Sequence, residues 1–203
     1  MQNKNHWYDG WFYDKIIAPN QDRMFNEIKN LIEPNSNVID IGCGTGRLSF
    51  SIADKVNKVV GIDLSTKNIN SANQTLRKNP NKKISFLHTN LADLISQKNR
   101  FDYAVMTYVI HEVNPEDRIS LLNEMTQIAD KIIIGDYLVP VHSGFWSLLN
   151  VIVEFLAGKE HYANFKDFAA NNGLLGLAKR ADLKVISEIK NKPVTSQILL
   201  LTK

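Results

Sequence analysis

Short runs of apolar, mostly β-branched residues alternate with helix-like stretches along most of this chain. The runs are almost continuously apolar, which is typical of strands that are covered on both faces of a sheet. Regular alternation with short connections predicts a parallel, doubly wound α/β sheet. The expected strands are residues 38–41, 58–63, 84–89, 101–108 and 131–137, and the expected helices between them are residues 45–54, 66–78 and 115–130.

The carboxyl-terminal part follows a different pattern. A helix expected over residues 165–181 is followed by two apolar runs, residues 183–189 and 195–203, with only "KNKPV" between them. Two strands on so short a connection must pair antiparallel. A standard dinucleotide-binding fold does not end in such a hairpin.

The first expected strand leads directly into three alternating glycines, in "VIDIGCGTGRL". Glycine accepts positive φ angles and lets a ligand approach the backbone closely. The dinucleotide fingerprint is G-x-G-x-x-G, but Arg47 stands where its third glycine would be. The turn therefore favours a nucleoside ligand other than a dinucleotide.

Two carboxylates accompany this turn. Asp40 is expected to point into the turn, where it would repel a pyrophosphate and attract an ammonium and a sulfonium. Asp63 ends the second strand, 21 residues after Gly42, where a carboxylate can accept both hydroxyls of a ribose. Together they favour S-adenosylmethionine over NAD.

Four segments, "VIDIGCGTGRLS", "VVGIDLS", "ISFLHTNLADL" and "FDYAVMTYVIHEV", resemble the successive motifs of the class I S-adenosylmethionine-dependent methyltransferases of the small-molecule type. The resemblance covers about residues 28–134. It implies a Rossmann-like, doubly wound, seven-stranded sheet that is mostly parallel, with one antiparallel strand near the carboxyl terminus. It also implies S-adenosyl-L-methionine as cofactor and S-adenosyl-L-homocysteine as product.

The same resemblance implies which residues bind the cofactor. Asp40 and the glycine turn would border the methionine part, Asp63 the ribose and Leu64 the adenine. Members commonly have an aspartate for the adenine amino group where this chain has Asn90, whose amide oxygen can accept the same bond, with Asp93 as the alternative. The full expected set is Tyr8, Tyr13, Asp40, Gly42, Cys43, Gly44, Gly46, Asp63, Leu64, Asn90, Leu91 and Tyr108.

The composition indicates where the protein is expected to be located and which partners it is not expected to bind. Cys43 is the only cysteine, so the chain forms no internal disulfide, and we expect a packing role, no thiol-based metal site and a cytoplasmic location. The net charge is only +3 and the lysines are scattered, so nucleic acid is not the expected partner. No apolar stretch approaches the ~20 residues that span a bilayer, and the first ten residues lack the apolar core of a signal peptide.

The segment after the fourth strand bears on the acceptor. "TYVIHEV" lacks the Asn/Asp-Pro-Pro-aromatic turn that is usual in enzymes that methylate amines of nucleic-acid bases. Small-molecule members often carry an apolar pair before a histidine, as Val109 and Ile110 stand before His111 here. We expect His111 in the acceptor pocket, where it could act as a base, or else as a cap of the local backbone.

The chain is expected to form a single domain, residues 1–203, with two segments outside the α/β pattern. Residues 1–27 are expected to form an amino-terminal aromatic cover and residues 141–165 a helical lid insertion. His161 and Tyr162 follow the apolar part of this lid, "FWSLLNVIVEFLA", and are expected to face the acceptor as catalytic residues together with His111. Asn164 is expected to cap the next helix, with Asp167 three residues on.

The expected function is S-adenosylmethionine-dependent methyl transfer to a small, apolar or aromatic acceptor. Three alternatives stay open: an RNA methyltransferase, a non-catalytic S-adenosylmethionine-binding partner subunit and an NAD-dependent oxidoreductase. Arg47 and the terminal hairpin weigh against the last.

Overall fold

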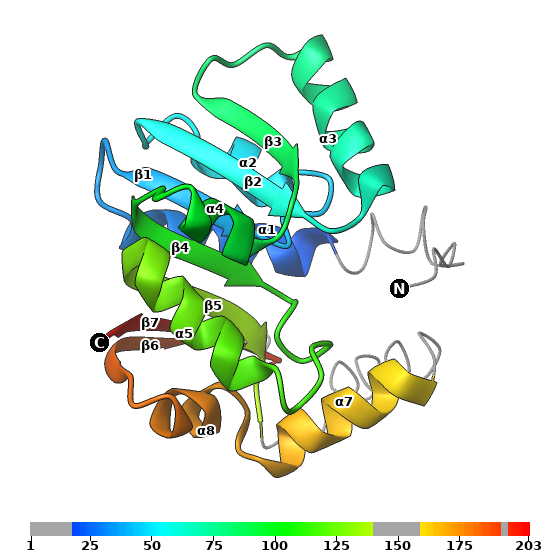
Figure 1. Cartoon of the computed structure of the whole chain (residues 1–203), viewed down its shortest axis with the longest axis vertical. Coiled ribbons are helices and arrows are strands. Elements are labelled where there is room, and N and C mark those ends of the chain that lie inside the picture. Colours follow the sequence, from blue (N-terminus) through cyan, green and yellow to red (C-terminus); the bar gives the residue numbers. More distant parts are fainter. Residues whose placement is uncertain (1–17, 140–158, 192–194) are drawn as a thin grey trace.

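The computed structural model describes residues 18–139, 159–191 and 195–203, with only the backbone described for residues 18–20 and 159–161. Seven strands form one sheet in the order β3-β2-β1-β4-β5-β7-β6 (Figure 1). The first five are parallel, and β7 runs antiparallel to both of its neighbours, which confirms the predicted fold. The strands are β1 (Asn37–Ile41), β2 (Lys58–Asp63), β3 (Ile84–His88), β4 (Phe101–Thr107), β5 (Ala129–Tyr137), β6 (Lys184–Lys190) and β7 (Ser196–Thr202).

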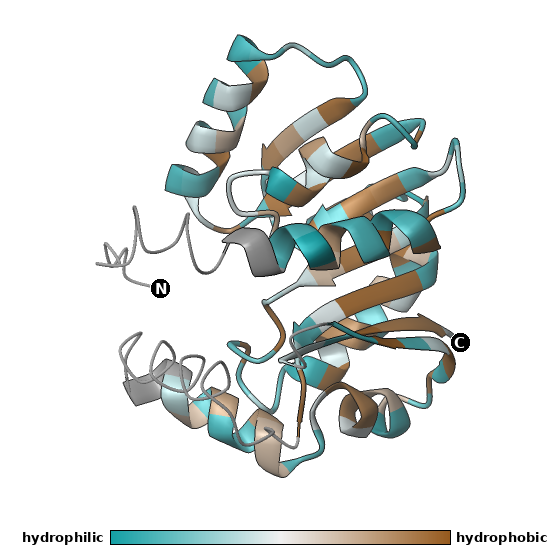
Figure 2. Cartoon of the chain, turned by 180° about the vertical axis from the view of Figure 1, so that it is seen from behind, coloured by the Kyte–Doolittle hydropathy of each residue, from teal (hydrophilic) through white to brown (hydrophobic). Residues whose placement is uncertain are grey.

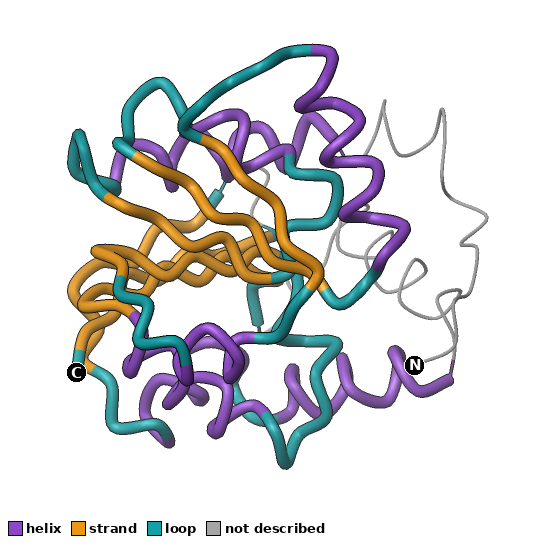
Figure 3. The backbone as a smooth tube through the Cα atoms, turned by 45° about the horizontal axis from the view of Figure 1, so that its top comes forward, coloured by secondary structure: helices purple, strands orange, loops and turns teal. Residues whose placement is uncertain are grey.

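Helices cover both faces of the sheet (Figure 3). Neighbouring strand residues alternate between the faces: Val38 packs in the core beneath α1 and α2, and Ile39 packs in the core beneath α4, α5 and α8. Hydrophobic residues accordingly fill the central strands, while hydrophilic residues gather on the outer helices (Figure 2). The described helices are α1 (Ala18–Leu31), α2 (Arg47–Ile52), α3 (Thr66–Lys78), α4 (Leu91–Ser96), α5 (Arg118–Ile128), α7 (Lys159–Ala170) and α8 (Gly173–Arg180).

The prediction of one helix over residues 165–181 is wrong. The structure has two helices, α7 and α8, with a break at Asn172 and Gly173, whose φ angles are 63° and 51°. Two successive residues with positive φ cannot continue a right-handed helix. Helices α1 and α4 were not predicted at all.

Both segments predicted outside the α/β pattern lie only partly within the described residues. Residues 18–27 of the expected amino-terminal cover lie in α1, where Met24 and Phe25 are buried in the core. Residues 159–165 of the expected lid lie in α7, and the remainder of both segments lies outside the described residues.

The end of α8 yields a prediction about stability. The amides of Leu183 and Asp182 donate to Ala178 O and Lys179 O over 2.9 Å and 3.3 Å, and Asp182 has a φ of 53°. This is the left-handed helix end that glycine favours. We expect the free energy of unfolding, measured in urea, to be about 1 kcal/mol higher for Asp182→Gly than for Asp182→Ala, because only the alanine carries a Cβ that is strained at this positive φ. Both variants lose the same carboxylate, so equal stabilities would contradict the backbone argument.

Candidate functional site

The glycine turn lies at the carboxyl edge of the parallel strands, directly after β1. Gly42, Gly44 and Gly46 have φ angles of 70°, 56° and 85°. The amides of Gly42 and Cys43 donate to Ile62 O over 2.9 Å and 3.0 Å, which ties the turn to the end of β2. A Cβ added at Gly44 would meet no atom of the described residues within 4 Å, whereas one at Gly46 would collide with the Phe86 ring. Gly44 therefore presents bare backbone on an open side.

Asp63 is the partner of this turn. Its Oδ2 accepts a hydrogen bond from the Gly44 amide over 2.9 Å, and its Oδ1 accepts one from the Ser65 amide over 2.7 Å. The carboxylate is half-buried and sits beside the open backbone of Gly44. Leu64, the next residue, is 64% exposed. Both residues are expected from the sequence to lie at the nucleoside part of the cofactor, and the structure brings them to the same edge as the turn.

Asp40 lies below the turn instead of on its surface. Its side chain is 1% exposed and accepts a hydrogen bond from Ser49 Oγ of α2 over 2.6 Å. Burial raises the pKa of Asp40 to about 6, and the nearby Asp63 charge adds to this rise, while the Ser49 hydrogen bonds oppose it. Asp40 can therefore act on a bound cation only through its charge.

Cys43 is packed inside the turn. It is 8% exposed, and burial, together with the charges of Asp40 and Asp63, raises the pKa of its thiol far above the ordinary value. A thiol that stays protonated is a poor nucleophile. The packing role expected for Cys43 agrees with this environment.

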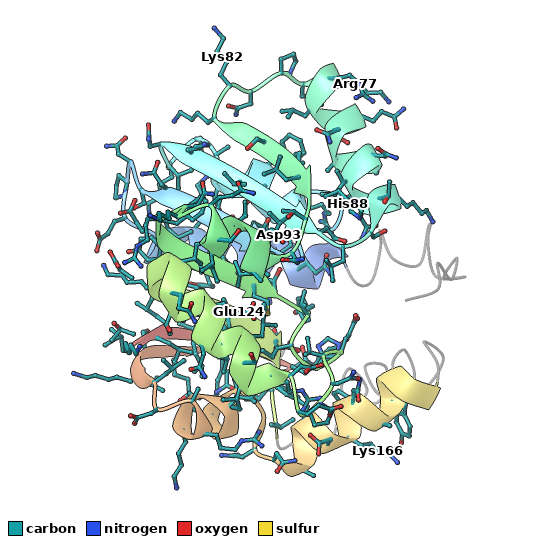
Figure 4. The ribbon with its side chains drawn as sticks, in the orientation of Figure 1. Arg77, Lys82, His88, Asp93, Glu124 and Lys166 are labelled. Atoms are coloured by element: carbon teal, nitrogen blue, oxygen red, sulfur yellow. The ribbon has the colours of Figure 1, made fainter. Side chains whose placement is uncertain are left out.

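The end of β3 leads to the residues expected at the adenine. Asn90 is exposed and caps α4, with its Oδ1 accepting from the Asp93 amide over 2.8 Å. An amide oxygen has a second lone pair that can accept another hydrogen bond. Leu91 is 4% exposed and packs in the core, so its side chain does not line this edge. His88 and Asp93 lie close to this end of the strand (Figure 4).

The segment after β4 contacts the glycine turn. A Cβ added at Gly42 would lie 2.5 Å from Val109 Cγ2, so the two segments are packed against each other. Tyr108 has a φ of 54°, which is rare for a bulky residue, and its amide donates to Gly135 O over 2.8 Å. This backbone conformation lies beside the expected cofactor site.

His111 is paired with a buried carboxylate. Its Nδ1 lies 2.7 Å from Asp136 Oδ1, and the two side chains are 2% and 0% exposed. Asp136 also accepts from the Tyr137 amide over 2.7 Å. The Nε2 atom of His111 lies 3.8 Å from Glu112 Oε1. The ring thus contacts the carboxylate of Asp136 within hydrogen-bond distance.

Aromatic side chains surround this pair. The Tyr137 ring lies 4.8 Å from the His111 ring, 5.5 Å from the Tyr108 ring and 5.4 Å from the Phe165 ring, between centroids. We call Tyr108, His111, Tyr137 and Phe165 the aromatic cluster. Sequence analysis missed Asp136, Tyr137 and Phe165. The signal for the first two was their position at the end of β5, because parallel strands place their carboxyl ends at one edge.

Helix α7 also carries some of the expected site residues. Tyr162 is half-buried, with Lys166 Nζ 4.8 Å from its ring centre, and Lys166 lies on the outer side of the helix (Figure 4). The backbone of His161 belongs to α7, but its side chain lies outside the described residues, as do Tyr8 and Tyr13 entirely.

The prediction that Asn164 caps a helix is wrong. The residue lies in the middle of α7, because this helix begins earlier, at Lys159. Asn164 is 8% exposed, and its Nδ2 donates to Glu112 O over 2.8 Å. Its role in the described structure is therefore to join α7 to the loop after β4.

Two absences concern only the residues that the structure describes. Among them no group of three or more histidine, cysteine or acidic side chains could hold a metal ion. Within the same ranges, no helix combines the length and the apolar character needed to cross a membrane.

The pKa of Asp40 yields a prediction for stability against pH. Between about pH 4 and pH 6, Asp40 is protonated in the folded protein and ionised in the unfolded chain. Its contribution therefore lowers the free energy of unfolding as the pH rises through this range, by about 3 kcal/mol in all. Asp40→Asn keeps an acceptor for Ser49 Oγ and removes the titration. We expect the variant to gain stability relative to wild type from pH 4 to pH 7.5, measured by urea unfolding.

The exposed Asp130 provides the control, since Asp130→Asn removes a carboxylate at the opposite edge of the sheet. A difference between Asp40→Asn and wild type that stays constant over this pH range would contradict the assigned titration.

Known proteins with similar sequences are methyltransferases. A family described as "Methyltransferase domain" matches residues 38–131. The 2-phytyl-1,4-naphtoquinone methyltransferase of Nostoc sp. is 29% identical over 170 residues, which cover 74% of each chain. The demethylmenaquinone methyltransferase of Lactococcus lactis is 30% identical over 94 residues, which cover 45% of this chain and 36% of the relative.

A solved structure supports the fold over almost the whole length. The magnesium protoporphyrin IX methyltransferase of Synechocystis PCC 6803, crystallised with bound S-adenosylhomocysteine, superimposes with a TM-score of 0.69 at 19% identity. The match covers 97% of this chain and 90% of that one. The family model and the relatives support a methyltransferase, and the solved structure supports the fold of the class I S-adenosylmethionine-dependent methyltransferases.

Proposed function

We propose that this methyltransferase acts on a small, apolar or aromatic molecule bound at the carboxyl ends of β4 and β5. The observation that carries the proposal is the His111–Asp136 pair within the aromatic cluster, on the loop whose Val109 packs against Gly42 of the glycine turn. Half-buried aromatic rings suit a planar acceptor, since ring faces and edges pair favourably. The Nostoc and Lactococcus relatives are named for a 2-phytyl-1,4-naphtoquinone and for demethylmenaquinone, whose rings are of this kind.

The edge formed by β1 and β2 fits the cofactor. Bound S-adenosylmethionine supplies an electrophilic methyl group on its sulfonium. The open backbone at Gly44 accepts a close ligand. The Asp63 carboxylate accepts long contacts from Asn68 Nδ2, at 3.4 Å and 3.5 Å, which ribose hydroxyls can replace. Leu64 offers exposed apolar surface to the adenine, and Asn90 offers its amide oxygen. The buried charge of Asp40 attracts the ammonium and sulfonium groups.

The aromatic cluster supplies what methyl transfer requires of the protein. The reacting atoms must be aligned, and water must be kept from the reaction. Tyr108, directly after β4, contacts Tyr137 of β5, and Phe165 closes the cluster from α7. Because three elements contribute to it, the cluster can fix the orientation of an acceptor ring.

His111 is proposed as the base for an acceptor that loses a proton. An ionised carboxylate only accepts hydrogen bonds, so the short contact to Asp136 places the ring hydrogen on Nδ1. Proton uptake then takes place at Nε2, near the Glu112 carboxylate. Such a carboxylate-oriented imidazole is the usual arrangement for a histidine base. We also propose that the enzyme works in the cytoplasm, since its free, buried cysteine suits a reducing compartment.

The proposal is tested with purified protein, S-adenosylmethionine and two acceptors, reduced 1,4-naphthoquinone and a single-stranded RNA. Mass spectrometry of both acceptors and of S-adenosylhomocysteine gives the outcome. We expect methylated naphthoquinol. Methylation of the RNA alone would overturn the small-molecule assignment, and cofactor binding without transfer to any acceptor would favour the partner-subunit alternative.

Replacing His111 tests the base. We expect His111→Gln to lower kcat by about 10²- to 10⁴-fold, because the proton acceptor is lost. S-Adenosylhomocysteine affinity, measured by calorimetry, should stay within about twofold, since the glycine turn is untouched. Glu116→Gln, an exposed change in the same loop, serves as control. A His111→Gln enzyme with wild-type kcat would refute the assigned role.

Replacing Asp63 tests the ribose contact. We expect Asp63→Ala to weaken S-adenosylhomocysteine binding by about 100-fold or more, because two hydroxyls lose a charged acceptor. Asp130→Ala removes an exposed carboxylate from the opposite edge and should bind normally. Because Asp63 also holds the Gly44 and Ser65 amides, urea unfolding of both variants must show an intact fold. Unchanged affinity in a folded Asp63→Ala protein would rule the contact out.

A further inference from the structure

We propose that Arg118 is a positioning residue of the acceptor site, which holds α7 against the loop that carries His111. The inference rests on the proposed function, because it concerns the same acceptor site. Arg118 is the first residue of α5 and is fully buried, at 0% exposure. Its guanidinium lies between the loop after β4 on one side and α7 on the other.

On the loop side, Arg118 binds backbone carbonyls. Its Nε donates to Val113 O over 2.9 Å, and its Nη2 donates to His111 O over 3.3 Å. These bonds hold the carbonyl side of the His111 backbone, while Asp136 contacts both the ring, at Nδ1, and the amide of the same residue, at 2.7 Å and 3.4 Å. The orientation of the imidazole therefore depends on both Arg118 and Asp136.

On the other side, Arg118 binds α7. Its Nη1 donates to Asp167 Oδ1 over 2.9 Å, its Nη2 donates to Asn164 O over 2.7 Å, and its guanidinium carbon lies 5.7 Å from the Phe168 ring centre. Asn164 in turn donates from Nδ2 to Glu112 O over 2.8 Å. The side chains of Arg118 and Asn164 thus join α7 to the loop after β4, two segments that are about fifty positions apart in the sequence.

The position of Arg118 is unfavourable for the helix that carries it. A cation at a helix amino terminus opposes the helix dipole. Burial lowers the pKa of Arg118, and the Asp167 charge only partly offsets this effect. Buried ion pairs are often replaced by apolar residues without loss of stability. An apolar side chain could not, however, fix carbonyls on two segments at once, as the planar guanidinium does.

The contact matters because α7 completes the aromatic cluster. Phe165 of α7 lies 5.4 Å from the Tyr137 ring and 6.4 Å from the His111 ring. A shift of α7 would move Phe165 relative to both rings. The glycine turn and Asp63, on β1 and β2, are held by their own hydrogen bonds. Loss of the Arg118 contacts should therefore affect the acceptor and spare the cofactor.

The experiment uses Asp167, because its side chain is 37% exposed and its removal should leave the protein folded. Asp167→Ala breaks the ion pair on the α7 side, Asp167→Glu restores a carboxylate, and Arg118→Lys keeps the charge without the planar geometry. Glu124→Ala, which removes a carboxylate elsewhere on α5 (Figure 4), is the matched control. Each full-length variant is studied by amide hydrogen exchange, by NMR of the His111 ring nitrogens, by S-adenosylhomocysteine calorimetry and by kinetics with reduced 1,4-naphthoquinone.

We expect Asp167→Ala and Arg118→Lys to exchange the amides of residues 163–170 about tenfold faster than wild type and to shift the His111 ring signals. KM for the naphthoquinol should rise by about tenfold, with cofactor affinity within about twofold. Asp167→Glu should recover most of each change, and Glu124→Ala should show none. Unchanged α7 exchange, unchanged His111 signals, or an altered α7 with unaltered KM would overturn the proposal. If wild type does not methylate the naphthoquinol, the proposed acceptor class fails, while the exchange and His111 signals still decide the role of Arg118.

Discussion

The hydrogen bond from the Gly44 amide to Asp63 is the contact on which the proposed cofactor site depends. It joins the turn after β1 to the end of β2, and the bonds to Ile62 O reinforce the junction. Only residues that tolerate positive φ can form this turn, and only a carboxylate at the strand end can hold the Gly44 and Ser65 amides together. The hydrogen bond from Gly44 to Asp63 thus closes the turn and leaves the other side of Gly44 open.

Two buried carboxylates lie next to the glycine turn and the aromatic cluster, the two parts of the proposed site. Asp40 lies under the glycine turn with Ser49, and Asp136 lies under the aromatic cluster with His111. A buried charge is costly unless it is hydrogen-bonded. Burial raises the pKa of Asp40, and Ser49 is its hydrogen-bond donor. Asp136 accepts a hydrogen bond from the Tyr137 amide and lies 2.7 Å from His111 Nδ1. Each carboxylate is suited to a positive charge above it, from the cofactor in one case and from the imidazole in the other.

Sequence patterns predicted the strands better than the helices. All seven strands lie within two residues of their expected limits. The central strands β1, β2, β4 and β5 are covered on both faces and therefore form continuous apolar runs, whereas β6 is mostly exposed and was indicated by the short link to β7. Helices α1 and α4 were missed, since α4 spans only six residues and α1 precedes the first glycine motif. The break between α7 and α8 depends on the left-handed Asn172, which an apolar pattern does not reveal.

The sequence alone determined the parallel sheet, the terminal hairpin and the glycine turn with Asp63, because each depends on a local signal: apolar runs, a short link, or glycines and an aspartate at strand ends. The tertiary structure decided the arrangement at the proposed acceptor side. Asp136, Tyr137, Phe165 and Arg118 carry no local motif, and they meet His111 only because β4, β5 and α7 come together there. Hydrogen bonds between segments far apart in the chain, such as the one from Arg118 to Asn164, produce no periodic pattern in the sequence, because tertiary packing determines which residues meet.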